Sequence, residues 1–391
     1  MDRKERHILF LSSWYPNRNA PTLGNFVQKH AEAAALYNQV TAFSVFSSEE
    51  VNQITMDESF VNGVNTLVVY YPKVKTSLPF YAQLLKFFRL QKAFYKGWKH
   101  IIKKYGTPDL THLNVVLPIG IFAAQLQRKY KIPFIVTEHS TAYHEGSNKL
   151  TPAERKIAVS VMNKASRLIP VSKDLDNSLR RAGVKTPSVI IPNVVNEAVF
   201  SQFSIKIPLI PQFLHISTAV DEHKNVSGII RTVSRMYKDG LSFSFKIISD
   251  GNLHPHRQLA KDLEIPENVL VFEGTKTTQE IAAEISRSTA LVLFSNYENF
   301  PCVIPEAFML GVPVISTAVN GIPEHVNATN GVLIPPKDEE ALYTAMNDFI
   351  LKKLTFPSDT VKEHALQHFS YSAVGKKLDE IYREVIAEYV S

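Results

Sequence analysis

The sequence contains almost no cysteine and no long apolar run. Cys302 is the single cysteine among 391 residues, which excludes a disulfide framework and any zinc site built from several cysteines. The apolar run at residues 8–11 is far shorter than the core of a signal peptide. No stretch approaches the roughly 18 to 20 apolar residues that a membrane-spanning helix needs. We therefore expect a cytoplasmic protein, soluble or bound peripherally to the inner face of the cell membrane.

Acidic residues are missing from one part of the chain. Residues 59–108 contain no Asp or Glu, whereas basic residues recur there, and the net charge of the whole chain is +6. Residues 82–105 follow a helical spacing. Apolar side chains gather on one face and basic ones on the other: Leu84, Phe87, Phe94, Trp98, Ile101 and Tyr105 against Lys86, Arg89, Lys92, Lys96, Lys99 and Lys103.

Two interpretations of residues 82–105 stay open. The helix either packs on its own domain and leaves a solvated basic face, or it forms a surface for anionic membrane lipid or a lipid-linked acceptor. Because no nucleic-acid-binding motif accompanies the basic segment, we expect no nucleic acid partner.

The rest of the composition is that of a globular protein with two domains. Apolar residues make up 45% of the chain and charged residues 20%, and the length exceeds what one core comfortably serves. Short β-type segments alternate with longer amphipathic ones, which predicts α/β domains with parallel sheets. Strands are predicted at 7–11, 40–46, 109–114, 133–137, 167–171, 188–191, 212–217, 243–249, 268–272, 290–294 and 312–316.

Proline and helical periodicity indicate the boundaries. Pro208 and Pro211 disfavour both helix and central strand, which places a linker at 205–212. The last segment has the apolar spacing of an amphipathic helix that begins after Ser370. We expect an N-terminal domain at 1–204, a second domain at 205–369 and a terminal helix at 370–391.

The most informative segment runs from residue 295 to residue 336. Glu298 and Glu306 follow a predicted strand, at the place where open α/β sheets bind ligands. Carboxylates there can accept hydrogen bonds from sugar or ribose hydroxyls, and a helix N-terminus offers N–H groups to a phosphate. An isolated pair of glutamates would be two ordinary solvated side chains, so the flanking pattern decides.

That flanking pattern closely resembles the donor-site signature of the family 4 retaining glycosyltransferases. It reads Glu-Asn-Phe-Pro at 298–301, Pro-Glu-Ala-Phe-Met-Leu-Gly-Val-Pro-Val-Ile-Ser-Thr at 305–317, Gly-Ile-Pro-Glu at 321–324 and Asn-Gly-Val-Leu-Ile-Pro at 330–335. Further matches are Trp-Tyr-Pro at 14–16, Thr-Leu-Gly-Asn-Phe-Val at 22–27, Thr-Glu-His at 137–139, Val-Ser-Lys at 171–173, Ile-Pro-Asn at 191–193 and Phe-Ser-Tyr at 369–371. The resemblance implies the GT-B fold: two Rossmann-like parallel-sheet domains face a central cleft, and a C-terminal helix crosses back to the N-terminal domain.

The resemblance also implies roles for individual residues. Glu306 would bind the ribose of a nucleotide, and Glu298 would bind hydroxyls of the transferred sugar. Lys224 would neutralise the diphosphate, His139 would lie near the reacting bond, and Gly24 would meet the phosphates from the opposite wall. The backbone of Asn299, Phe300 and Pro301 would contact sugar and phosphate.

The activity implied is retaining transfer of a hexose-type sugar. The donor would be a UDP- or GDP-sugar and the acceptor a carbohydrate or lipid-linked precursor, with cell-envelope polysaccharide assembly as the setting. We expect no cofactor and no metal. The acidic pair Asp174 and Asp176 fits a capped helix start after Ser172, and His254 with His256 fits a surface pair.

One departure from the family keeps other functions open. Ala219 stands where the family has an arginine, so one of two diphosphate cations is missing unless His223 compensates. A non-catalytic protein that binds nucleotide sugar as a scaffold is therefore an alternative. Another is a GT-B enzyme of different chemistry, an epimerase or a phosphorylase.

Overall fold

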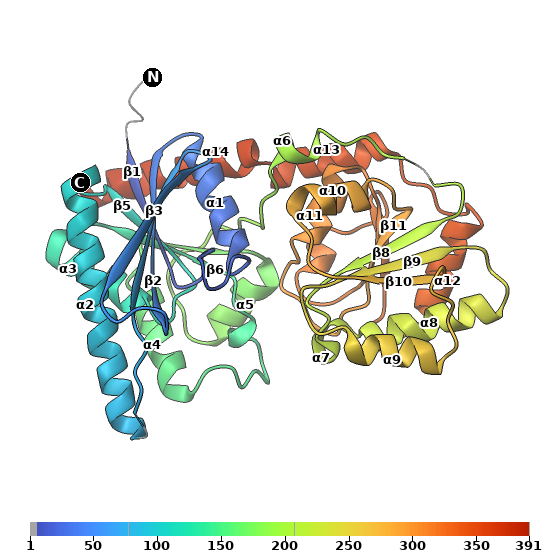
Figure 1. Ribbon diagram of the computed structural model, residues 1–391. Coiled ribbons are helices and arrows are strands. Elements are labelled where there is room, and N and C mark those ends of the chain that lie inside the picture. The colour runs from blue at the N-terminus through green and yellow to red at the C-terminus, as the bar shows by residue number, and fades with distance from the viewer. Residues whose placement is uncertain (1–5, 77, 207, 391) are drawn as a thin grey trace. The chain divides into compact units, whose positions relative to one another are not determined.

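The computed structural model describes residues 6–76, 78–206 and 208–390, which form two compact units (Figure 1). The outermost ends of the expected domains, residues 1–5 and 391, lie outside the described residues, as does residue 207 of the expected linker. Unit 1 comprises the described residues up to Val171, then Leu175–Val194, and the segment from Tyr371 onward. Unit 2 comprises Ser172–Asp174 and Val195–Ser370. The domain boundary expected at residue 205 stays a prediction.

Unit 1 is built on a mainly parallel sheet. Within the described residues this sheet has seven strands in the order β3-β4-β2-β1-β5-β6-β7, and only β3 runs antiparallel to its neighbour. The strands are β1 (His7–Ser12), β2 (Gln39–Ser48), β3 (Thr55–Val61), β4 (Val64–Pro72), β5 (Leu110–Asn114), β6 (Phe134–Glu138) and β7 (Arg167–Pro170). The predicted strand at 188–191 is wrong, because only Ser188 forms an isolated bridge, to Leu168.

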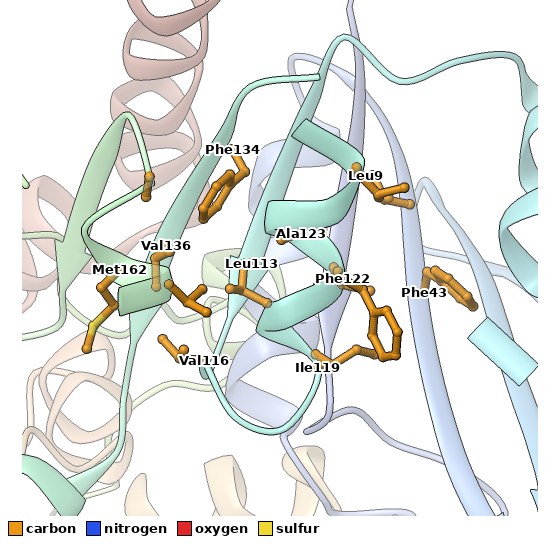
Figure 2. Close-up of a cluster of buried hydrophobic side chains, with 14 of the residues drawn as sticks. Leu9, Phe43, Leu113, Val116, Ile119, Phe122, Ala123, Phe134, Val136 and Met162 are labelled. Carbon is orange, nitrogen blue, oxygen red and sulfur yellow. The ribbon is translucent and has the colours of Figure 1, made fainter. Parts of the chain in front are cut away.

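Helices cover both faces of this sheet: α1 (Asn25–Ala35), α2 (Pro79–Tyr105), α3 (Gly120–Tyr130), the short helix η1 (Thr141–Tyr143), α4 (Pro152–Met162), α5 (Lys173–Arg181) and α14 (Tyr371–Val390). On one face, Phe122 of α3 packs among strand residues, as Figure 2 shows, and stacks on Phe94 of α2 at 4.3 Å between ring centroids. The local sequence explains where α4 begins, because Thr151 and Glu154 form a capping box.

The terminal helix α14 belongs to unit 1, which confirms the predicted crossing back to the N-terminal domain. Its apolar residues Val374, Leu378 and Val385 are buried on the face of the sheet that α1 also covers. The Tyr371 hydroxyl donates to Glu32 of α1 at 2.7 Å.

Unit 2 is a parallel sheet between helices. In the part of the chain that the structure describes, six strands follow the order β10-β9-β8-β11-β12-β13. They are β8 (Gln212–Ile216), β9 (Ser244–Ile248), β10 (Leu270–Glu273), β11 (Ala290–Leu293), β12 (Val314–Thr317) and β13 (Gly331–Ile334). The helices are α6 (Glu197–Phe200), α7 (Asp221–Lys224), α8 (Val226–Lys238), α9 (His254–Asp262), α10 (Thr278–Ile285), α11 (Val303–Met309), η2 (Ile322–Glu324), α12 (Glu339–Ile350) and α13 (Ser358–Phe369). Two parallel α/β sheets confirm the predicted fold class.

No helix among the described residues combines the length and the apolar character that crossing a bilayer requires.

Candidate functional site

The strand order of unit 2 places its sequence-predicted residues at a switch point. β8 pairs with β9 on one side and with β11 on the other, so the chain leaves these two central strands in opposite directions along the sheet. Ligands of open α/β sheets bind in the crevice that forms at the carboxyl ends of such strands. Lys224 follows β8, and Glu298 follows β11. Strand order therefore brings together two residues that are far apart in the sequence.

Lys224 and Glu298 form an ion pair at this edge. The Lys224 ammonium lies 2.5 Å from Oε1 of Glu298, and the side chains are 18% and 8% exposed. The Ser295 hydroxyl donates to the same carboxylate oxygen at 2.9 Å. Charge-assisted hydrogen bonds of this kind are strong where water is largely excluded. The ion pair therefore fixes the Lys224 ammonium beside the Glu298 carboxylate, which can accept further hydrogen bonds.

The loop that carries Glu298 is fixed by the segment after β12. The Thr317 hydroxyl donates to the Ser295 carbonyl at 2.6 Å, and the Glu298 N–H donates to Asn320 at 3.2 Å. The Gly321 N–H donates to the Asn299 carbonyl at 3.1 Å. A Cβ at Gly321 would lie 2.4 Å from that same oxygen, so the contact requires glycine. The loop is held in one geometry before any ligand arrives.

Glu306 and Phe300 are both buried, Glu306 within α11 and Phe300 in the core of unit 2. Glu306 is buried in α11, directly after the Glu298 loop. The Phe300 side chain is buried in the core of unit 2, with its ring centroid 4.6 Å from that of His325 and 5.4 Å from that of Phe369. The burial of its side chain leaves the backbone of Phe300 for a ligand, and the contact of residues 299–301 with sugar and phosphate stays a prediction.

Ala219, at the position where the resemblance implies an arginine, has a left-handed backbone conformation. Its φ is +52°, its side chain is buried, and its carbonyl accepts a hydrogen bond from Nε2 of His256 at 3.0 Å. A left-handed φ strains any residue that carries a Cβ, alanine included, so the backbone conformation does not explain why an arginine is missing here. His256 is itself buried, so the predicted surface pair of histidines is wrong for His256, whereas His254 is exposed.

His215 supports the β8 end of the site and was not singled out in the sequence. Its Nδ1 lies 2.8 Å from the Val292 carbonyl, and its Nε2 lies 2.7 Å from the Ser217 hydroxyl. Ser217 in turn accepts the Ala219 N–H at 3.0 Å. Burial, reinforced by the nearby Lys224 charge, lowers the pKa of His215 to about 4. The sequence offered one sign of this role, namely that His215 is a polar residue within the apolar strand β8.

The acidic pair Asp174 and Asp176 lies in the first turn of α5. The N–H groups of Lys173 and Asp174 donate to the carboxylate of Glu324 at 2.8 and 2.9 Å, and Asp176 pairs with Arg180 at 3.3 Å. The ion pair with Arg180 accounts for Asp176, whereas the Asp174 carboxylate accepts a hydrogen bond from the Asn320 side chain at 3.2 Å. Over the described ranges, no group of three or more His, Cys, Asp or Glu side chains is arranged to hold a metal ion.

Unit 1 brings Gly24 and His139 to one edge of its own sheet. Gly24 ends the loop after β1 with φ +64°, and a Cβ there would lie 2.3 Å from the Trp14 backbone. His139 follows β6, and its ring centroid lies 4.4 Å from that of Phe26, in the first turn of α1. Burial lowers the pKa of His139 well below its ordinary value. Gly24 thus follows β1, one strand of the switch point between β1 and β5, and His139 follows β6, the neighbour of β5; their roles stay predictions.

Comparison with known families gives two matches along the chain. The family described as "Glycosyltransferase Family 4" matches residues 33–199, and the family described as "Glycosyl transferases group 1" matches residues 210–351.

Two curated relatives are similar over most of their length. A putative colanic acid biosynthesis glycosyltransferase of Salmonella typhimurium is 24% identical, over 68% of this chain and 69% of the relative. An uncharacterised glycosyltransferase of Methanocaldococcus jannaschii is 28% identical, over 74% of this chain and 79% of the relative.

Solved structures share the fold. Sucrose-phosphate synthase from Thermosynechococcus elongatus superposes with a TM-score of 0.77 at 19% identity, covering 98% of this chain and 100% of that one. The Anabaena protein HepE in complex with UDP-glucose gives a TM-score of 0.72 at 16% identity, covering 97% and 100%.

Proposed function

This chain is a glycosyltransferase with the GT-B fold, and from that premise we propose that it transfers a hexose-type sugar from a UDP- or GDP-sugar with retention of configuration. The observation that carries this proposal is the Lys224–Glu298 ion pair at the switch point of unit 2, on a loop held rigid by Thr317, Asn320 and Gly321. HepE, which shares the fold, was solved with UDP-glucose, and this supports a nucleotide sugar as the donor.

The ion pair suggests how the donor is received. In the free protein Lys224 is held by Glu298. A diphosphate competes for the ammonium group, while sugar hydroxyls replace it as hydrogen-bond donors to the carboxylate. Glu306 would take the ribose hydroxyls. When the ion pair separates, the diphosphate would thus replace Glu298 as the partner of Lys224, and sugar hydroxyls would replace Lys224 as donors to Glu298.

Lys224 would act most strongly during bond cleavage. As the bond between the sugar anomeric carbon and the phosphate oxygen breaks, negative charge grows on the departing diphosphate, and a fixed cation stabilises that charge more than it stabilises the bound donor. The acceptor oxygen then attacks the same face of the sugar, and its proton passes to the departing phosphate oxygen. His139 would lie beside the reacting bond.

Similar proteins suggest the biological setting. The Salmonella relative is named for colanic acid biosynthesis, and a Bacillus subtilis relative, 23% identical, is named for teichuronic acid biosynthesis. We propose that this chain also contributes to polysaccharide assembly, with a carbohydrate or lipid-linked acceptor.

Helix α2 supports contact with an anionic membrane, through fewer residues than the sequence pattern suggested. Phe94, Trp98 and Ile101 are fully buried in the core of unit 1, whereas the first turns leave large apolar side chains in solvent. We call residues 78–92 the α2 tip; its exposed apolar residues are Leu78, Tyr81, Leu84, Phe87 and Phe88. Figure 1 shows the N-terminal end of α2 extending beyond the sheet of its unit.

Charge supports one class of partner for the α2 tip. Lys86 and Lys92 are exposed on it, and residues 59–108 contain no acidic residue. Aromatic and basic side chains together suit the interface of a bilayer that contains anionic lipid. We therefore propose that the enzyme works at such a surface, where a lipid-linked acceptor would be found.

Nucleotide binding tests the donor site. Titration calorimetry with UDP and with GDP should show that one of the two binds to the wild type, and Glu306→Ala should weaken this binding on the order of 100-fold, because two hydrogen bonds to a buried carboxylate are lost. Glu267→Ala, which removes an exposed glutamate of unit 2, serves as the control. Wild-type affinity in Glu306→Ala would remove the proposed nucleotide site.

Product analysis separates the alternatives. Transfer requires an acceptor, whereas an epimerase changes the donor without one, and a scaffold binds the donor without turnover. A phosphorylase would consume inorganic phosphate.

A further inference from the structure

Glu138 is a buried carboxylate at the end of β6 with several hydrogen-bond donors around it. Its Oε2 accepts the N–H of Val116 at 3.1 Å. Its Oε1 accepts the N–H groups of His139 and Ser140 at 2.9 and 2.8 Å. The Tyr143 hydroxyl adds a side-chain hydrogen bond. Glu138 has no solvent exposure, and burying a carboxyl group costs free energy unless its oxygens accept hydrogen bonds. The same hydrogen bonds fix the positions of the groups that donate them.

The hydrogen bond to Val116 reaches a strained segment. Val115, directly before it, has φ +58°, a conformation that β-branched residues rarely adopt. Such strain persists only where the surroundings hold the backbone in place, and it gathers at functional sites. Glu138 accepts the amide that follows the strained residue, so it ties the segment after β5 to the segment after β6.

The His139 ring packs against neighbouring side chains. Phe26 and His30 lie at ring-centroid distances of 4.4 and 5.4 Å, and Asn193 makes a side-chain hydrogen bond with it. These contacts limit the rotation of the imidazole. They do not set where the backbone of residue 139 lies, and that is what the contact between its N–H and Glu138 does.

We propose that Glu138 is a positioning residue: its carboxylate fixes the backbone of His139 against the strained segment after β5 and thereby aims the imidazole at the reacting sugar. This inference rests on the proposed role of His139 in transfer. Glu138 itself is fully buried and touches neither donor nor acceptor in this scheme. Its effect on the rate should therefore pass entirely through His139.

The first test is Glu138→Gln, in which an amide nitrogen replaces one acceptor oxygen and cannot accept the N–H groups that this oxygen holds. We expect kcat to fall at least tenfold, KM for the donor to change less than twofold, and hydrogen–deuterium exchange to rise in peptides covering 138–143. The matched control is Glu32→Gln, another buried carboxylate of unit 1, which accepts from Gln28, Asn62 and Tyr371. It should keep wild-type kcat and wild-type exchange in 138–143.

A double-mutant cycle separates positioning from general damage. In a His139→Ala background, Glu138→Gln should lower kcat by less than a further twofold. An equal fall in both backgrounds would overturn the proposal, and so would unchanged kcat or unchanged exchange at 138–143 in Glu138→Gln. Wild-type kcat in His139→Ala alone would instead overturn the proposed role of His139, and with it the route by which Glu138 is inferred to act.

A milder variant covers the case in which Glu138→Gln does not fold. Glu138→Asp keeps a carboxyl group on a side chain one methylene shorter, so it should keep the contacts with residues 139 and 140 and release Val116. We expect a smaller fall in kcat that again disappears in the His139→Ala background. Wild-type kcat in Glu138→Asp, together with raised exchange at the released Val116 amide, would contradict the proposal.

Discussion

Among single residues, Lys224 is the one whose partner should change during the reaction. In the free protein its ammonium and the Ser295 hydroxyl both donate to the same carboxylate oxygen of Glu298. A diphosphate that binds Lys224 must displace Glu298, so the free energy of the ion pair is subtracted from the free energy of binding. During bond cleavage, negative charge grows on the departing diphosphate, and Lys224 stabilises it increasingly. The ion pair is already broken at that stage, so no further loss offsets this stabilisation.

Replacing Lys224 should therefore damage the rate more than the affinity. Lys224→Ala is expected to lower kcat by about 100- to 1000-fold, the effect of removing one group that stabilises transition-state charge. Affinity for UDP or GDP should fall by a smaller factor. Single-turnover kinetics and calorimetry on the same variant measure the two quantities, and equal losses in both would mean that Lys224 acts only in binding.

Sequence reasoning located the residues of the site better than their supports. Glu298, Glu306 and Lys224 were predicted because a long motif surrounds the first two and a helix start follows the third, although their roles stay predictions. Glu138 and His215 were not predicted as supports, because their importance lies in hydrogen bonds to backbone groups that are distant in the sequence. Such contacts leave no pattern in one sequence.

Among the elements, α14 depends on one close contact with α1. A Cβ at Gly375 would lie 2.3 Å from the carbonyl oxygen of Ala33, and this oxygen is backbone that cannot rotate away. Gly375→Ala should thus cost about 1 to 3 kcal/mol despite the higher helix propensity of alanine. Thermal unfolding measures the loss. Lys376→Ala, at an exposed neighbouring position, should stay within about 0.5 kcal/mol of the wild type.

Helix α2 permits a separate test through its tip. Replacing Leu84, Phe87 and Phe88 by glutamine, or Lys86 and Lys92 by glutamate, should weaken binding to phosphatidylglycerol vesicles at least about tenfold. Added salt should weaken the wild type in the same direction. Vesicle co-sedimentation measures both, with the exposed Lys261→Glu of unit 2 as control. Equal binding by wild type and tip variants would exclude the α2 tip as the docking surface.

Element prediction succeeded where burial gave a clear apolar run. Most strands were located because central parallel strands are buried on both faces. The hairpin of β3 and β4 was missed, although Asn62-Gly63, both with positive φ, is a strong hairpin signal. The short β13, which begins at Gly331, was missed as well, and the segment at 188–191 has an apolar composition without the sheet pairing it suggested.

On the scale of the whole molecule, buried histidines should make the fold sensitive to acid. Burial lowers the pKa of His7 and of His215 to about 4, against an ordinary value of 6.5. Between these values the unfolded chain binds protons that the native state refuses, so stability rises with pH there and is lost as pH falls from 6.5 toward 4. Each histidine contributes up to about 3 kcal/mol to this loss.

Calorimetry from pH 7.5 down to pH 4.5 measures the effect. The melting temperature should stay nearly level above pH 6.5 and fall below it. A double variant, His7→Gln with His215→Gln, should show a shallower fall. A wild-type melting temperature that is constant between pH 6.5 and pH 4.5 would contradict the prediction.

The whole fold was more predictable than the order of its strands. Alternating patterns predicted two α/β sheets, and both are present. The pattern could not predict that β8 lies between β9 and β11, because lateral order depends on crossover connections rather than on local composition. The switch point, which gives Lys224 and Glu298 their common edge, was therefore visible only in three dimensions.

The return of α14 to unit 1 has a consequence for synthesis of the protein. The apolar residues that α14 covers on α1 and the sheet are translated before most of unit 2, whereas α14 itself is translated after unit 2. Until then, a nascent unit 1 presents an unfinished apolar surface, whereas unit 2, translated in between, can close its core alone. The protein should thus mature in the opposite order to its translation, with the later unit complete before the earlier one.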